Sequence, residues 1–355
     1  MKRKFALLIL MILALSVALV ACNNADPTEI ATRWQPDEYT FNITKADFTT
    51  GQEYLSNDEI YSNLDQIAPD DVSGTYTLKI EQTSGTTNWT VTTSQTLYAQ
   101  YSKSNVTLSD SELQQVIVTD AQEISGTTLT PEDNKVILKS TTYTEVVFDD
   151  SKKQTPLSSK TELNGFYIGR RHQEVSSYTV ETTYDYSGKR AVAKISIDGN
   201  DPVKHKFGRN ASFIDSNQIL MYVRSLDKPS KGFQDNPSVT VFNPYTGETS
   251  SVTFTLNYDT QLLLTDTLRN ATVKTSVNVV TVKVGGTHFM QQENVPNLTK
   301  TAGFEDVDLL RGDRKDADKP KYTTIRFRVG YLAYELKTYD ENIWNALQPA
   351  AAPEA

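Results

Sequence analysis

The stretch Tyr76-Thr77-Leu78-Lys79-Ile80-Glu81 alternates between apolar and polar side chains. Successive side chains of a β-strand point to opposite faces, so this period of two predicts a strand with one packed face and one wetter face. Roughly eleven to thirteen segments predict strands in this way, which indicates a mainly β protein. The clearest alternating runs lie at 76–81, 89–101, 136–148, 178–184, 193–197, 252–258, 277–284 and 325–329.

The residue mix agrees with a β protein. The chain has 18 Tyr against 4 Met and is rich in Thr, Ser and Val, which suit a pleated, half-buried surface. Turn residues such as Ser187-Gly188 and Pro244-Tyr245-Thr246-Gly247 separate many of the runs, and this favours antiparallel hairpins. A single sheet of so many strands must curl or split, because twist accumulates from strand to strand.

Two segments have helical spacing instead. Asn57–Ile67 carries apolar residues three and four apart and is followed by a proline, which is a stop signal. Asp215–Leu226 carries a wider apolar stripe, and either Asp215 or Ser216 can serve as its N-cap. We expect Leu220 and Val223 of this second helix to be buried against the sheet.

The N-terminus has the layout of a secretion signal. Three basic residues, Lys2 to Lys4, precede the uncharged apolar run Phe5–Val20, which is short for a membrane span of about 20 residues. The run ends in Leu19-Val20-Ala21-Cys22, which resembles the lipobox of bacterial lipoproteins. The resemblance implies cleavage between Ala21 and Cys22 and a diacylglyceryl group on the Cys22 thiol. The alternatives are an ordinary signal peptide with a chance cysteine, or a buried N-terminal helix.

This interpretation divides the chain into four parts. We expect a signal peptide at 1–21, a flexible tether at 22–36, a β-rich extracellular domain at 37–346 and a disordered tail at 347–355. Loss of the three basic residues takes the formal net charge from −9 to −12. Such a charge argues against nucleic acid as a partner and against electrostatic docking on anionic lipid. Cys22 is the only cysteine, so no disulfide can form within the chain.

Five elements of the chain follow one pattern: the strand Tyr178–Tyr184, the turn Asp198-Gly199, the helical segment Phe213–Leu226, and the segments Val239–Gly247 and Val284–Phe289. With this pattern, the region from about Leu157 to Val284 resembles a family of uncharacterised bacterial envelope proteins. The resemblance implies an antiparallel sheet strongly curled, as a half-barrel, around a central helix. That architecture is similar to the lipoprotein-carrier superfamily of LolA, LolB and LppX-like proteins, which hold acyl chains in a concave apolar face. The last matching element departs from the family pattern, because the usual Pro-Ala before Gly-Thr is replaced.

A search for catalytic chemistry finds little. His172, His205 and His288 are far apart, and none has a partner at metal-ligand spacing. No nucleophile elbow or phosphate-binding loop is present, and we expect no cofactor and no metal. The short basic segments 170–172 and 204–206 are interpreted as solubilising charge at strand ends. Acidic side chains cluster at 65–71, 149–150 and 305–318. Solvated loops explain them, although a carboxylate pair brought together by folding stays possible.

Three functions are compatible with these observations. The first is a non-catalytic lipoprotein, anchored on the extracytoplasmic face of the cell membrane, that binds an apolar or amphiphilic envelope ligand. Its mark would be a continuous apolar inner face without a convergent polar cluster. The second is a structural or protein-interaction lipoprotein without a cavity, and the third is a hydrolase of envelope polymers. From the sequence we expect membrane lipid to be a partner through Cys22, and protein partners stay unknown.

The anchor is testable directly. We expect Cys22→Ser to release the protein from membranes or to leave it unprocessed, because a diacyl group is what makes anchoring firm. Membrane fractionation, with the length of the chain checked by mass spectrometry, measures both outcomes. A variant that is cleaved normally and stays membrane-bound at wild-type levels would contradict the assignment.

Overall fold

The computed structural model describes residues 37–45, 68–124, 127–150, 154–168, 173–224, 238–266, 269–284, 287–296, 322–329 and 332–337. Strands dominate these residues. They are β1 (Asp37–Lys45), β2 (Asp71–Gln82), β3 (Trp89–Ser102), β4 (Ile117–Val118), β5 (Gln122–Ile124), β6 (Thr127–Leu129), β7 (Lys135–Phe148), β8 (Pro156–Ile168), β9 (Gln173–Asp185), β10 (Arg190–Ile197), β11 (Val203–Arg209), β12 (Phe213–Asp215), β13 (Ser238–Asn243), β14 (Glu248–Asp266), β15 (Ala271–Val284), β16 (Thr287–Pro296), β17 (Tyr322–Val329) and β18 (Leu332–Leu336). The helices are η2 (Lys103–Asn105), α4 (Asp110–Val116), η3 (Ser216–Gln218) and α5 (Ile219–Arg224).

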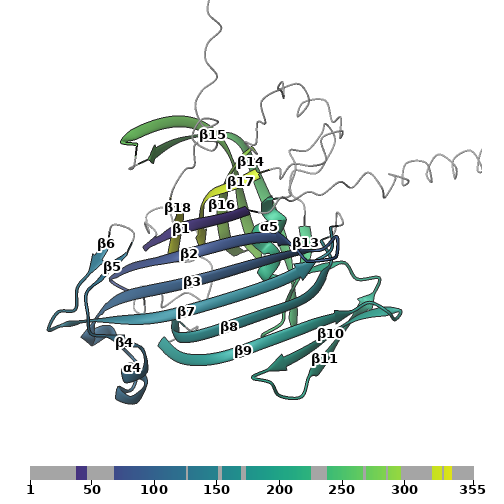
Figure 1. Ribbon diagram of the computed structural model, residues 1–355, viewed down its shortest axis with the longest axis horizontal. Helices are drawn as coiled ribbons and strands as arrows, with labels where there is room; N and C mark the ends of the chain where they lie inside the picture. Colours follow the sequence, from purple (N-terminus) through teal and green to yellow (C-terminus); the bar gives the residue numbers. More distant parts are fainter. Residues whose placement is uncertain are drawn as a thin grey trace, which may run out of the picture.

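One 16-stranded sheet contains all of these strands except β5 and β6 (Figure 1). Its order is β11-β10-β9-β8-β7-β3-β2-β1-β18-β17-β16-β15-β14-β13-β12, and β4 pairs with β7 beside this path. Among the described strands, all pairings are antiparallel except that of β12 with β13. Most spatial neighbours are also neighbours in sequence, and β1 joins β18 to connect the first and last strands.

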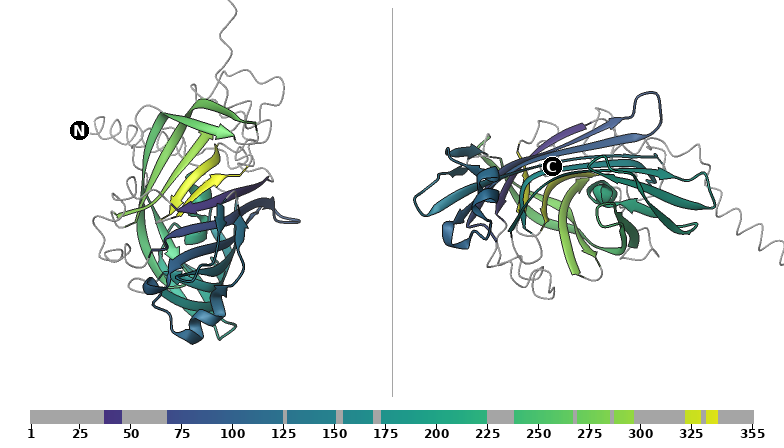
Figure 2. Two further views of the ribbon diagram at one scale, coloured as in Figure 1. Left: turned by 90° about the vertical axis from the view of Figure 1, so that its left-hand side faces the viewer. Right: turned by 90° about the horizontal axis from the view of Figure 1, so that it is seen from below.

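The sheet curls around α5, which lies inside the curve (Figure 2). One apolar cluster joins strands that lie far apart in the sheet order. It includes Phe41 of β1, Trp89 of β3 and Phe254 of β14, which are all fully or almost fully buried. α5 adds Met221 and Val223, which have no exposed surface. The helix therefore occupies the interior that the twisted sheet encloses. Because it packs against the concave face, a sheet of this length can bury that face.

The two ends of the sheet meet through side chains. Within the described chain, β11 and β12 share no backbone ladder. Instead Phe207 of β11 stacks on Phe213 of β12 with ring centroids 3.8 Å apart, and Phe207 also meets Phe242 of β13 edge-on at 5.0 Å. Such aromatic pairs contribute about 0.5–1.5 kcal/mol each beyond their burial. We call this cluster the seam; it consists of Val180, Tyr184, Ala193, Ile195, Phe207, Phe213 and Phe242.

The fold class predicted from the sequence is confirmed: the protein is mainly β, with a large curled antiparallel sheet and short helices. The predicted turn at Asp198-Gly199 joins β10 to β11, with positive φ at both residues, as a tight hairpin turn requires. The number of strands was underestimated, in part because β4, β5, β6 and β12 have only two or three residues each. A period of two cannot be recognised over so short a length.

The helices were predicted in part. η3 and α5 begin where the second helix was expected, with Asp215 as the N-cap, and Leu220 and Val223 are buried as expected. α4 was missed, although Ser109 and Glu112 form its capping box. That Ser-x-x-Glu signature is visible in the sequence. The segment Asn57–Ile67 lies outside the described residues. No helix in the described part of the chain has both the length and the apolar character to cross a membrane.

Truncation of the Leu220 side chain tests whether α5 belongs to the core. We expect Leu220→Ala to lower the free energy of unfolding by about 2–5 kcal/mol, as truncations of buried leucines do. The matched control is Leu263→Ala, because Leu263 is 67% exposed and its loss should change stability by less than about 0.5 kcal/mol. Equilibrium urea denaturation measures both. Equal effects of the two substitutions would show that α5 does not belong to the core.

Candidate functional site

A buried carboxylate, Asp215, is the N-cap of η3, which continues into α5. We call η3 and α5 together the interior helix. Its Oδ1 accepts a hydrogen bond from the backbone N–H of Asn217 at 2.9 Å, and its own N–H donates to Oε1 of Gln218 at 2.8 Å. Gln218 in turn donates to the carbonyl oxygen of Gln154 at 2.8 Å. This capping box satisfies the free N–H groups of the first turn. Asp215 and Gln218 have no exposed surface.

The same carboxylate ties the helix to the opposite end of the sheet. The hydroxyl of Tyr184, on β9, donates to Oδ2 of Asp215 at 2.5 Å. Burial raises the pKa of Asp215, while hydrogen bonds from Ser159 and Tyr184 hold it down in part. Burial and the nearby Asp215 carboxylate both raise the pKa of Tyr184. The phenol therefore stays protonated and remains a donor to the carboxylate.

A pocket of about 240 Å³ lies between this helical turn and the inner face of the sheet. Three aromatic rings form one wall. Phe327 and Tyr334 stack with centroids 4.2 Å apart, and Tyr76 meets both edge-on at 5.4 Å. The complete lining is Tyr76, Thr93, Gln95, Thr142, Thr144, Ser216, Asn217, Ile219, Leu220, Phe327, Val329 and Tyr334.

Beside these rings the lining of the pocket is polar, and Tyr76 of β2 pairs directly with Gln95 of β3. β3 and β7 contribute hydroxyl and amide groups, and Oγ1 of Thr93 lies 2.5 Å from Oγ1 of Thr144. The Tyr334 hydroxyl donates to Oε1 of Gln95 at 2.9 Å. Burial raises the pKa of Tyr76 to about 12, although a hydrogen bond with Thr93 opposes the rise, so this ring is neutral at physiological pH. The pocket thus combines an aromatic wall with an uncharged hydrogen-bonding wall.

A second pocket, of about 200 Å³, lies on the other side of Ser216 and Asn217, which line both pockets. Nδ2 of Asn217 donates to Oγ1 of Thr161 at 3.0 Å. Tyr178 of β9 stacks on Tyr245 of the β13–β14 turn with centroids 4.7 Å apart. Its lining is Ser159, Thr161, Tyr178, Val180, Ser216, Asn217, Asn243, Pro244 and Tyr245. The first turn of the interior helix therefore separates two small, uncharged pockets.

The inner face of the sheet is not continuously apolar, because it is polar at β3 and β7. Thr93 and Gln95 of β3 interrupt an otherwise apolar inward phase, and Thr144 and Thr142 lie directly opposite them on β7. The result is a polar patch in the middle of the concave face. The sequence shows these polar residues at core-facing positions of the two alternating runs 89–101 and 136–148. The pairing of those positions was not available, because β3 and β7 are separated by more than thirty residues.

Among the residues that the structure describes, those singled out for chemistry are not brought together. Ala21, Cys22, His172 and the acidic segment 305–318 lie outside the described residues. His205 packs on Phe242 of the seam with centroids 4.9 Å apart, and the His288 side chain is not described. In the described part of the chain, no three His, Cys, Asp or Glu side chains are placed to hold a metal ion.

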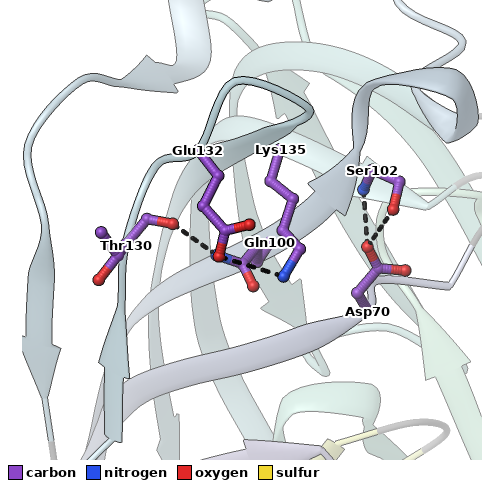
Figure 3. Close-up of polar contacts among 6 residues, drawn as sticks. All are labelled: Asp70, Gln100, Ser102, Thr130, Glu132 and Lys135. Atoms are coloured by element: carbon purple, nitrogen blue, oxygen red, sulfur yellow. Dashed lines mark hydrogen bonds and ion pairs between the residues drawn. The ribbon is translucent and has the colours of Figure 1, made fainter.

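The acidic residues near the start of β2 have structural partners (Figure 3). Oδ2 of Asp70 accepts hydrogen bonds from both the N–H and the hydroxyl of Ser102, each at 2.7 Å. Oδ1 of Asp71 accepts from the N–H of Val72 at 2.8 Å. Gln100 donates to the carbonyl oxygen of Thr130 at 2.8 Å in the same region. These contacts fix the ends of β2 and β3 and explain these carboxylates without a ligand.

Comparison with known proteins gives few matches. No known protein family matches the chain, and no curated protein sequence matches it. A solved structure from Brucella abortus, described as a beta-barrel-like protein of domain of unknown function DUF1849, has 10% sequence identity and a TM-score of 0.43. The match covers 85% of this chain and 95% of that one. A likeness at this level supports no statement about activity or ligand.

The bond between Tyr184 and Asp215 has a pH signature. The pKa of Asp215 in the folded state lies above its unfolded value, so stability falls as pH rises between those two values. The Tyr184 hydroxyl holds the pKa of Asp215 down. Tyr184→Phe should therefore raise this pKa further, and stability should then fall over a wider range of pH. We expect the variant to lose about 1–3 kcal/mol at a pH above the raised pKa. Below the ordinary carboxyl range it should lose less, since Asp215 is then protonated in both states.

Urea denaturation over a series of pH values measures this effect. The control is Tyr186→Phe, because Tyr186 also donates a hydrogen bond, to the carbonyl oxygen of Pro156 at 2.8 Å, and is 38% exposed. A cost of Tyr184→Phe that is the same at every pH would show that the phenol does not act on the carboxylate.

Proposed function

We propose that this protein is a non-catalytic lipoprotein, anchored through Cys22 on the extracytoplasmic face of the cell membrane, that binds a small amphiphilic envelope ligand. The proposed anchor is supported by the basic, apolar and lipobox-like segments at residues 2–22. The proposed binding role is supported by the pocket between the interior helix and the concave face of the sheet. The relationship to lipoprotein carriers remains part of this proposal.

The observation that carries the binding role is the mixed lining of the larger pocket. Tyr76, Phe327 and Tyr334 offer apolar ring surface, whereas Gln95 and Thr144 offer hydrogen-bonding groups beside it. Ligand sites commonly pair an apolar surface with a few placed polar groups. A ligand that suits this lining has an apolar part and uncharged hydroxyl, ether or amide groups.

The pocket also limits the ligand's size and charge. Its volume of about 240 Å³ is below the roughly 300–1,000 Å³ of typical small-molecule sites, so it suits a small ligand or one end of a longer one. Among the described residues that line either pocket there is no Lys, Arg, His, Asp or Glu. An ionised group placed there would have no opposite charge to pair with, and burying it would be costly.

A chain without residues 1–22, which keeps every described residue, tests the binding role. We expect native mass spectrometry to find a co-purified amphiphile, and a fluorescent monoacylglycerol, which carries no ionised group, to bind saturably after delipidation. Thr142→Phe should weaken uptake about 5- to 150-fold, because overpacking the pocket costs about 1–3 kcal/mol.

The control for this substitution is Thr141→Phe, since Thr141 is the neighbouring residue on β7 and does not line the pocket. Its uptake should match that of the unsubstituted chain. No bound mass and no saturable uptake would contradict the binding role and favour a protein-interaction lipoprotein. Equal uptake by the two variants would show that the ligand lies elsewhere.

A further inference from the structure

The β10–β11 hairpin at the end of the sheet (Figure 1) carries a charge opposite to that of the whole chain. Between residues 186 and 211 there are six Lys or Arg and two Asp, whereas the full chain has a formal net charge of −9. The basic segment 204–206, expected at a strand end, instead lies within β11. The positive charge is therefore built into the strands.

Strand register gathers these cations on one face. Lys194 of β10 lies directly opposite Lys204 of β11, and Arg190 lies opposite Arg209. Lys206 lies between these two pairs, and all five side chains are exposed. We call these five residues the basic face. The alternate positions of both strands, including Ala193 and Phe207, are buried in the seam, so the basic face points away from the interior.

The basic face is only weakly neutralised. Lys194 lies 3.7 Å from a carboxylate oxygen of Asp185. Across the described chain, no ion pair to Arg190, Lys204, Lys206 or Arg209 is formed. Like charges directly opposite each other in a sheet are destabilising. Two such pairs side by side are a cost that an external anion would remove.

Protection of an exposed edge does not account for this pattern. Lysines on a terminal strand prevent pairing with other chains, which covers Lys204 and Lys206 of β11. Lys194 and Arg190 are on β10, which is paired on both sides, by β9 and β11. Cations on the inner strand of the hairpin are therefore unexplained by edge protection.

We infer that the basic face docks on anionic phospholipid head groups of the membrane that carries the protein. No described residue of this face lines either pocket, so its partner is recognised by charge density over a sheet surface. The choice of a membrane rests on the proposed anchor at Cys22. The net charge of the chain argued against docking on anionic lipid, but it does not decide the contact made by this local face, because charges more than about 10 Å away are screened at 0.1 M salt.

Vesicle binding by the chain without residues 1–22 tests the inference separately from the anchor. The probes are vesicles of phosphatidylglycerol mixed with phosphatidylcholine, and of phosphatidylcholine alone, compared by flotation at about 0.1 M salt. The unsubstituted chain should bind only the first. Substituting Lys194, Lys204 and Lys206 together by Gln should weaken that binding about a hundredfold, since each cation near an anionic surface contributes several-fold.

The matched control substitutes Lys79 of β2, Lys103 of η2 and Lys135 of β7 by Gln, which removes the same charge outside the basic face. It should bind like the unsubstituted chain. The thermal midpoint of the first variant should not fall, because the change relieves like-charge contacts. Absence of binding to the anionic vesicles, equal loss in both variants, or binding to a soluble glycerol-phosphate polymer but not to vesicles would overturn the inference. Each of these results leaves the tests of Cys22 and of the pocket unaffected.

Discussion

A hydrogen bond between two buried side chains, Tyr184 and Asp215, connects the parts of this structure that the backbone leaves unconnected. The sheet begins at β11 and ends at β12, and these two strands share no backbone ladder in the described chain. Asp215 lies at the end of β12 and caps the interior helix, while Tyr184 comes from β9 near the other end of the sheet. One carboxylate therefore helps fix the curl of the sheet and the position of the helix within it.

The pockets follow from this constraint. Because Asp215 fixes the first helical turn, Ser216 and Asn217 are held between the two pockets and line both of them. The remaining residues of the helix fill the apolar interior, and Val223 is fully buried. A sheet of this length that closed on a continuous apolar face would have no place for hydrogen-bonding ligands. The threonines and Gln95 on β3 and β7 provide that place.

Much of the fold could be predicted from the sequence, because long strands such as β2 and β3 alternate between apolar and polar residues over much of their length. The interior helix was also predictable, since Asp215 and the apolar stripe after it are adjacent in the chain. The seam and the pocket were not, because they depend on pairings between distant segments. Nothing local in Phe207 or Phe213 indicates that they stack. Likewise Thr93 and Thr144 become a polar patch only when register places them opposite each other. The basic face has the same origin, since Arg190 and Arg209 oppose each other only through strand pairing.

Hydrogen exchange of the backbone amides tests most directly whether Asp215 joins the seam to the interior helix. Asp215→Ala should lower protection together in β11, β12 and α5, while β2 and β3, which are paired along their whole length, keep theirs. Unchanged protection in all of these elements would contradict this account. Loss confined to α5, with β11 protected as before, would show that the carboxylate caps the helix but does not hold the ends of the sheet together.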